Sequence, residues 1–184
     1  MLNREDALRL VTKYLKDDRL IKHCYAVEAI MEKLGKRLGE DGELWGITGL
    51  LHDLDYEYTK DHPEKHANLT AQILDGLIPE DCANAIKAHN YMHTDYIPTN
   101  SLDKALIAAD AVSGLIIAAA LVMPSKKLSD VRLETLINKF KDASFAKGCN
   151  RKRIELCIDA GIELEPFLEM SLNALQDISD DLGL

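Results

Sequence analysis

The chain has 184 residues, of which 47% are hydrophobic and 29% are charged, proportions that favour a globular domain over a disordered chain. Its net charge of −9 argues against a protein that wraps duplex nucleic acid or coats an anionic membrane, although a local basic cluster could still bind a small anion. The four cysteines form no CxxC pair and no signal peptide is recognised, so we expect reduced thiols and a cytoplasmic protein.

Helical periodicity dominates the first half of the sequence. Asn3 can cap a first helix, with Asp6 as its capping partner. Apolar residues at spacings of three and four predict a second helix, which the glycines at positions 39 and 42 end. Prolines suit the first turns of two later helices. The expected helices after the first cover about residues 20–38, 43–56, 63–77 and 79–89.

The second half follows a polar, aromatic loop at residues 90–100. Ser101 can cap a long apolar helix that Pro124 ends, and further helices are expected at about residues 129–141, 150–160 and 166–181. The uncharged stretch 111–123 is shorter than the roughly 20 residues of a membrane span, so it indicates a buried central helix. Since no strand-like alternation stands out, we predict an all-α, single-domain helical bundle comprising residues 1–184.

Several histidines and one aspartate share the apolar faces of these helices. They are His23, His66, His89 and Asp110, while His52 lies near two glycines that allow close helix packing. A lone histidine on such a face is usually a core residue. A buried carboxylate, however, costs several kcal/mol unless it is paired or binds a metal. The combination favours a shared cation, and imidazole with carboxylate suits Fe, Mn, Zn or a similar divalent ion rather than calcium.

The order His23, His52-Asp53, Asp110 resembles the H…HD…D signature of the HD-domain superfamily of metal-dependent phosphohydrolases. The surrounding segments GLLHD (49–53), AIKAH (85–89) and AAD (108–110) fit as well. The resemblance covers roughly residues 20–122, and two later segments are similar to a bacterial subgroup of predicted hydrolases. It implies a helical HD core at about residues 20–122 with a helical C-terminal extension at about residues 124–184.

The resemblance also implies a ligand set. His23, His52, Asp53 and Asp110 would hold one metal ion. In members with two ions, two further histidines lie between the HD pair and the last aspartate. His66 and His89 occupy those places here, with Asp53 bridging, and His62 and His93 are the alternatives. We therefore expect one or two divalent transition metal ions.

The sequence departs from many relatives where a lysine usually follows the HD pair closely, because the first lysine here is Lys60. Between residues 126 and 153, nine basic residues face three acidic ones, so this window could supply the phosphate contacts instead. Its candidates for substrate binding are Lys126, Lys127, Lys147 and Arg151. The alternative interpretation of the window is a solvated helix face.

The resemblance implies a phosphohydrolase acting on a phosphate ester or anhydride of a nucleotide or another small phosphorylated metabolite. Asp53 would be central to catalysis, and Glu57, one turn later, could orient a ligand or donate a proton; it could equally be a solvated carboxylate. A di-iron oxygenase of the same fold and a non-catalytic metal-binding sensor are the alternatives. We expect no nucleic-acid polymer and no membrane as partner.

Overall fold

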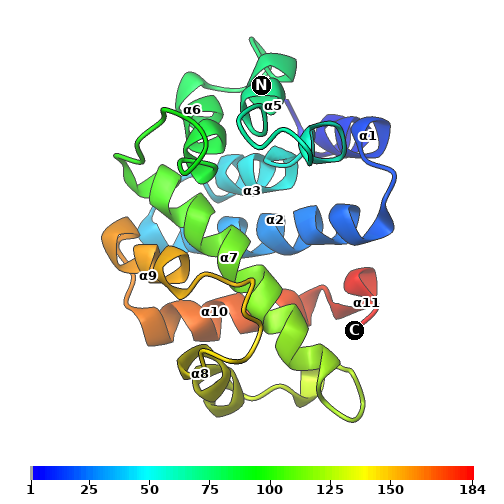
Figure 1. Ribbon diagram of the computed structural model, residues 1–184, viewed down its shortest axis with the longest axis vertical. Helices are drawn as coiled ribbons and strands as arrows, with labels where there is room; N and C mark the ends of the chain where they lie inside the picture. Colours follow the sequence, from blue (N-terminus) through cyan, green and yellow to red (C-terminus); the bar gives the residue numbers. More distant parts are fainter. Residues whose placement is uncertain (1) are drawn as a thin grey trace.

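The computed structural model describes residues 2–184, and in this range it contains helices and turns but no strand, which confirms the all-α prediction (Figure 1). The helices are α1 (Arg4–Tyr14), α2 (Asp18–Leu38), α3 (Gly42–Leu51), α4 (Tyr56–Thr59), α5 (Asn68–Ile73), α6 (Glu80–His89), α7 (Ser101–Leu121), the 3-10 helix η1 (Leu128–Asp130), α8 (Leu133–Lys141), α9 (Arg151–Ala160), α10 (Leu164–Asp177) and α11 (Ser179–Leu182).

Local capping explains where several of these helices begin and end. The Asn3 side chain accepts a hydrogen bond at the start of α1, as expected, and Gly39 ends α2 in the left-handed conformation with φ of 78°. Helix α7 is capped by Asn100 rather than by the predicted Ser101. The reason is a reciprocal capping box, in which Asn100 and Asp103 each accept a hydrogen bond from the other's backbone N–H.

Helix α7 forms the centre of the molecule and crosses it diagonally in Figure 1. It packs against α2, α6 and α9, and residues such as Leu106 and Ile116 are fully buried. By length and composition alone α7 could cross a membrane, but 61% of its most apolar window is buried by the rest of the protein. The helix is therefore the central core helix that the sequence predicts.

Helices α2 and α3 lie unusually close together because α3 carries glycines on the contact face. A Cβ atom at Gly49 would lie 2.9 Å from the carbonyl oxygen of Val27, and one at Gly46 would lie 3.2 Å from Cβ of Glu32. Only glycine allows this backbone approach at Gly49. The close packing brings the end of α3, where His52 follows, next to the middle of α2.

Two predicted helices are shorter than expected at this end of the molecule. The helix predicted for residues 43–56 ends at Leu51, and residues 52–55 form turns. The helix predicted for residues 63–77 is reduced to α5, because residues 63–67 form turns and Ala67 has a φ of 71°. The Asn90 side-chain amide donates to the backbone carbonyls of residues 63 and 66, so tertiary hydrogen bonds replace helical ones there.

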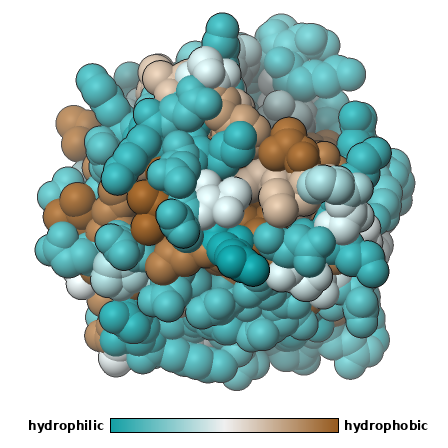
Figure 2. Space-filling view, turned by 90° about the horizontal axis from the view of Figure 1, so that it is seen from below, coloured by the Kyte–Doolittle hydropathy of each residue, from teal (hydrophilic) through white to brown (hydrophobic). Residues whose placement is uncertain are grey.

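The C-terminal helices α8, α9 and α10 lie along the lower part of α7 in Figure 1, and α10 also packs on α2. The helix predicted for residues 166–181 is divided into α10 and α11. Viewed from below, this part of the molecule presents a mainly hydrophilic surface with separate hydrophobic areas (Figure 2). Leu121 and Val122, at the end of α7, are 49% and 57% exposed. The division into a core and a C-terminal extension stays a prediction.

Candidate metal centre

Six side chains from five parts of the chain meet in one cluster, which we call the HD cluster. They are His23 on α2, His52 and Asp53 directly after α3, His66 before α5, His89 at the end of α6, and Asp110 on α7. His52 and Asp53 are adjacent in the sequence, and in a continuous helix the side chains of adjacent residues point in directions about 100° apart. Here, where α3 gives way to turns, His52 Nε2 and Asp53 Oδ1 lie 3.3 Å apart.

Asp53 lies at the centre of the cluster. Its Oδ1 atom is 3.3 Å from Nε2 of His52 and 3.4 Å from Nε2 of both His66 and His89. Its Oδ2 atom is 3.6 Å from Nε2 of His23. Oδ1 is buried and has no hydrogen-bond partner within residues 2–184. A buried carboxylate oxygen without a donor is costly, and a cation bound at Oδ1 would remove that cost.

Two of the imidazole rings are fixed by carbonyl groups of their own helices. Nδ1 of His52 lies 2.8 Å from the carbonyl oxygen of Gly49, and Nδ1 of His89 lies 2.5 Å from that of Ile86. A carbonyl oxygen can only accept, so each Nδ1 must carry a hydrogen. In the neutral rings this leaves an unprotonated Nε2 facing the cluster, which is the form that binds metal ions.

His66 is oriented by a residue that the sequence analysis missed. Asp55 is fully buried, and its Oδ1 accepts a hydrogen bond from Nδ1 of His66 at 2.8 Å. Its Oδ2 accepts one from the backbone N–H of Thr70 at 2.9 Å, in the first turn of α5. Asp55 thus fixes both the ring and the helix that follows it. An aspartate two residues after the HD pair was visible in the sequence, but its partner Thr70 was not.

His23 is oriented through α7. Ser113 donates its hydroxyl hydrogen to the backbone carbonyl of Asp110 at 2.8 Å, and its Oγ lies 3.2 Å from Nδ1 of His23. With its hydrogen used in this way, Ser113 acts as an acceptor for Nδ1–H. Nε2 of His23 therefore faces the cluster, 3.2 Å from Oδ1 of Asp110.

The spacing of these atoms suits transition metal ions. Nε2 of His23 and His52 are 3.3 Å apart, and Nε2 of His66 and His89 are 3.1 Å apart. Where both nitrogens of such a pair are unprotonated, they repel each other unless a cation lies between them. Metal–ligand bonds of about 2.0–2.1 Å give neighbouring ligand atoms separations of about 2.9–3.4 Å in octahedral or tetrahedral geometry. The donor set therefore fits such an ion, and two groups in the cluster have ligand atoms close enough together to hold one: His23 with His52 and Asp110, and His52 with Asp53 and His89.

The electrostatic environment shifts the pKa values of the histidines in different directions. Burial lowers the pKa of His52 to about 4, which keeps this ring neutral at pH 7. Burial also lowers the pKa of His23 and His66, but nearby carboxylates outweigh it and raise both above 6.5. Burial raises the pKa of Asp53 and Asp110, but the surrounding histidines, and for Asp110 also Arg153, lower both pKa values below the ordinary carboxyl range, so both groups stay ionised.

The two alternative histidines lie outside the cluster. The side chain of His62 is 57% exposed, and its Nδ1 lies 3.5 Å from a carboxylate oxygen of Glu64. His93 is exposed in the loop after α6. The structure thus brings His66 and His89, rather than this pair, to Asp53, and their role as ligands stays a prediction.

Glu57 does not have the position that its predicted role requires. Its Oε1 atom accepts hydrogen bonds from the backbone N–H groups of Lys16 and Asp17, at 3.0 and 2.6 Å. It therefore fixes the loop between α1 and α2. This contact favours a structural role for Glu57, and the prediction that it orients a ligand or donates a proton stays untested.

The predicted lysines also lie away from the cluster. Lys126 and Lys127 are exposed beyond the end of α7, and eleven helical residues separate Asp110 from that end, which corresponds to about 16 Å. The structure therefore does not bring these two residues to the cluster, and their role in binding the substrate phosphate stays a prediction. Lys147 is exposed in the loop at residues 142–150 and makes no hydrogen bond or ion pair with the HD cluster.

Arg151 has a structural role instead of the predicted one. Its guanidinium donates to the backbone carbonyls of residues 139, 140, 142, 145, 146 and 149. These bonds hold the loop between α8 and α9 in place. With its donors used by the protein, Arg151 is not available for a phosphate group.

The basic residue that does reach the cluster is Arg153. Its Nη2 atom donates to Oδ2 of Asp110 at 2.8 Å and to the carbonyl oxygen of His89 at 2.9 Å. Arg153 lies in the basic window between residues 126 and 153, but it was not among the predicted substrate-binding residues. No local pattern distinguishes it from Arg151 or Lys152, because only the packing of α9 against α7 brings it to the cluster.

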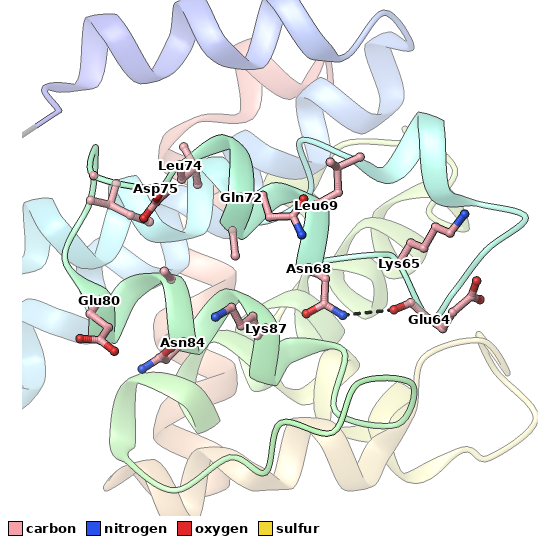
Figure 3. A pocket seen from close by; sticks show the side chains of 14 residues that line it. Glu64, Lys65, Asn68, Leu69, Gln72, Leu74, Asp75, Glu80, Asn84 and Lys87 are labelled. Atoms are coloured by element: carbon pink, nitrogen blue, oxygen red, sulfur yellow. Dashed lines mark hydrogen bonds between the residues drawn. The ribbon is translucent and has the colours of Figure 1, made fainter.

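A pocket of about 340 Å³ opens at the cluster. It is lined by Leu20, His23, Asp53, Tyr56, His66, His89, Asn90, Asp110 and Arg153. A larger pocket of about 970 Å³ lies between α5 and α6 (Figure 3), but no member of the HD cluster lines it. The charged side chains there, such as Lys65, Lys87 and Glu80, include both signs. The smaller pocket is therefore the candidate active site.

Comparison with known proteins agrees with this geometry. The chain is 32% identical over 156 residues to a protein named Ribonuclease Y from Enterococcus faecalis, an alignment that covers 79% of this chain and 28% of that protein. The chain thus spans little more than a quarter of the length of this relative. No solved structure matches this chain. The HD domain family matches residues 20–115, more than half of the chain. This protein therefore belongs to the HD domain family, a superfamily of metal-dependent phosphohydrolases.

Proposed function

We propose that the protein is a metal-dependent phosphohydrolase that acts on a phosphate ester or anhydride of a nucleotide or another small metabolite. One observation carries the proposal: the Nε2 atoms of four histidines and the unpartnered Oδ1 of Asp53 converge beside a small pocket. When bound, divalent ions supply Lewis acidity that activates water and polarises a phosphoryl oxygen.

The residues divide into two overlapping groups. His23, His52, Asp53 and Asp110 would hold one ion, and His66 and His89 would hold a second together with Asp53. The nitrogen and oxygen donors suit Fe, Mn or Zn. Asp53 is the shared member, and its contact with all four histidines makes it the residue on which both groups depend.

A small substrate is supported by the pocket and by the charge of the chain. A volume of about 340 Å³ lies near the lower end of the range for ligand pockets and suits a phosphate with a small attached group. A net charge of −9 is unfavourable for a nucleic-acid polymer. We propose no membrane partner and, from the four free cysteines, a cytoplasmic setting.

A second candidate is a ribonuclease, because the aligned relative is named Ribonuclease Y. Both reactions would use the HD cluster on a phosphorus centre, so the cluster itself does not separate them. An oxygenase would use the same donors with two iron ions and consume oxygen instead.

The test uses purified protein loaded with Mn, Fe or Zn and its Asp53→Ala variant, with exposed His93→Ala as control. Metal content, phosphate release from nucleotides and small phosphoesters, cleavage of RNA oligonucleotides and oxygen consumption are measured. We expect phosphate release by the protein and the control, and loss of metal and activity in Asp53→Ala. RNA cleavage or oxygen consumption without phosphate release would replace the proposed reaction, and unchanged metal content in Asp53→Ala would contradict the site.

A further inference from the structure

Arg153 connects the C-terminal helices to the candidate active site. It lies on α9, outside the segment 20–115 that matches the HD domain family, and yet it lines the same pocket as Asp53 and the histidines. Its Nη2 atom contacts Oδ2 of Asp110 and the carbonyl oxygen of His89. Oδ1 of Asp110 faces His23 instead, so the two oxygens of Asp110 have different partners.

The hydrogen-bond donors of Arg153 are only partly used. A guanidinium carries five N–H groups, and the two contacts of Arg153 use those of Nη2. The Nε–H is buried and has no acceptor, and Nη1 makes no hydrogen bond within residues 2–184. An unpaired buried donor such as Nε–H is costly, and Nη1 also has N–H groups free for an acceptor that enters the pocket beside Arg153.

No other arginine or lysine is among the residues that line this pocket. Lys60, the first lysine after the HD pair, lines a neighbouring pocket with Arg19, and the two pockets share only Leu20 and Tyr56. The amide of Asn90 already donates to two backbone carbonyls. Within the described residues, Arg153 is therefore the one permanently charged cation that lines the pocket at the HD cluster.

We propose that Arg153 binds the phosphate group of the substrate, using the N–H groups that the protein leaves free. The inference rests on the proposed function. These N–H groups would donate charge-assisted hydrogen bonds to phosphate oxygens, from a side chain that always carries its positive charge. Two divalent ions would balance the carboxylates of Asp53 and Asp110, so Arg153 gives the loaded pocket additional positive charge. The C-terminal helices thus supply the phosphate contact that the segment after the HD pair lacks.

The test measures binding without turnover. Inorganic phosphate is titrated by calorimetry into metal-loaded protein, Arg153→Gln, Arg153→Lys and the exposed neighbouring control Lys152→Gln, with metal content measured in each. We expect Arg153→Gln to bind phosphate about 10- to 100-fold more weakly at unchanged metal content. Lys152→Gln should match the unmodified protein. Arg153→Lys should be intermediate, because an ammonium group keeps the positive charge but cannot bind Asp110 and the phosphate group with the geometry of a guanidinium.

Equal phosphate affinity in Arg153→Gln and the unmodified protein would overturn the inference, as would an absence of phosphate binding to the metal-loaded protein. If Arg153→Gln loses metal, Arg153→Lys decides: weaker phosphate binding at full metal content supports the phosphate contact, and unchanged binding reduces Arg153 to a support for Asp110. Arg153-dependent phosphate binding without hydrolysis of any phosphoester would refute the proposed reaction alone. Hydrolysis with phosphate binding independent of Arg153 would refute this inference alone.

Discussion

Asp55 offers a sharp test of how the HD cluster is organised. It is fully buried, and its two carboxylate oxygens each accept one hydrogen bond, from Nδ1–H of His66 and from the backbone N–H of Thr70. Asp55→Asn preserves the shape but leaves one acceptor oxygen and adds an NH₂ donor. One of the two partners must therefore lose its acceptor.

The two partners differ in their ability to adapt. The backbone N–H of Thr70 is always a donor, whereas an imidazole can move its proton from Nδ1 to Nε2. We expect the new amide to keep its oxygen on Thr70 and to donate to His66, which then carries a hydrogen on Nε2. A hydrogen bond to a charged group contributes roughly 1.5–3 kcal/mol, and loss of an outer partner of a metal-binding histidine weakens metal affinity by about 10- to 100-fold. The expected loss is therefore about 1.5–3 kcal/mol of metal-binding free energy.

The assay is competition for Mn or Zn with a chelator, carried out on the unmodified protein, Asp55→Asn and the control Asp61→Asn. Asp61 is exposed in the same segment. The control should bind metal normally, and Asp55→Asn should retain its helical circular dichroism. Metal affinity of Asp55→Asn within about twofold of the unmodified protein would refute this account of how the ring is oriented.

Three further predictions follow from contacts described above. Glu57→Ala should lower the free energy of unfolding by about 1–2 kcal/mol in urea denaturation, because the backbone N–H of Asp17 loses its acceptor, while metal content stays unchanged. Gly49→Ala should lower it by about 1–3 kcal/mol, since the new Cβ would lie 2.9 Å from the Val27 carbonyl oxygen; a normal thermal midpoint would contradict the helix spacing. Metal affinity should fall as the pH drops, beginning above pH 6.5, because carboxylates raise the pKa of His66 and protons compete with the ion. Affinity that stays constant between pH 8 and pH 6 would exclude that competition.

The six members of the HD cluster were predicted from the resemblance to the HD-domain superfamily, and helical spacing placed three of them, His23, His89 and Asp110, on inward faces of helices that the structure contains. His23 and Asp110 illustrate this: each lies in a long periodic helix, and the structure brings His23 Nε2 and Asp110 Oδ1 to 3.2 Å. Close helix packing was likewise predicted from Gly46 and Gly49, and these two glycines lie where α3 packs against α2. In a long, regular helix the spacing of residues in the sequence determines which face each side chain lies on, so the positions of such residues are the easiest to predict.

The parts that were not predicted depend on contacts between distant segments. Residues 63–67 have a helical pattern, yet they form turns because Asn90 and Asp55 bind groups in and after this segment. Arg151 and Arg153 are two positions apart in one basic run, and only their tertiary contacts make one a loop anchor and the other a neighbour of Asp110. Sequence spacing contains no information about such partners.

The position of Arg153 has a practical consequence for anyone who would excise the recognisable module. A fragment cut at residues 20–115 would retain all six members of the HD cluster, but it would remove Arg153 from Asp110 and separate Glu57 from the N–H groups of residues 16 and 17. It would also remove the last six residues of α7. The surfaces of α2 and α7 that α9 and α10 cover in the whole protein would become exposed. The family boundary marks where sequences remain comparable, whereas the packing contacts of the matched segment extend beyond it on both sides, to α1 and to α9 and α10.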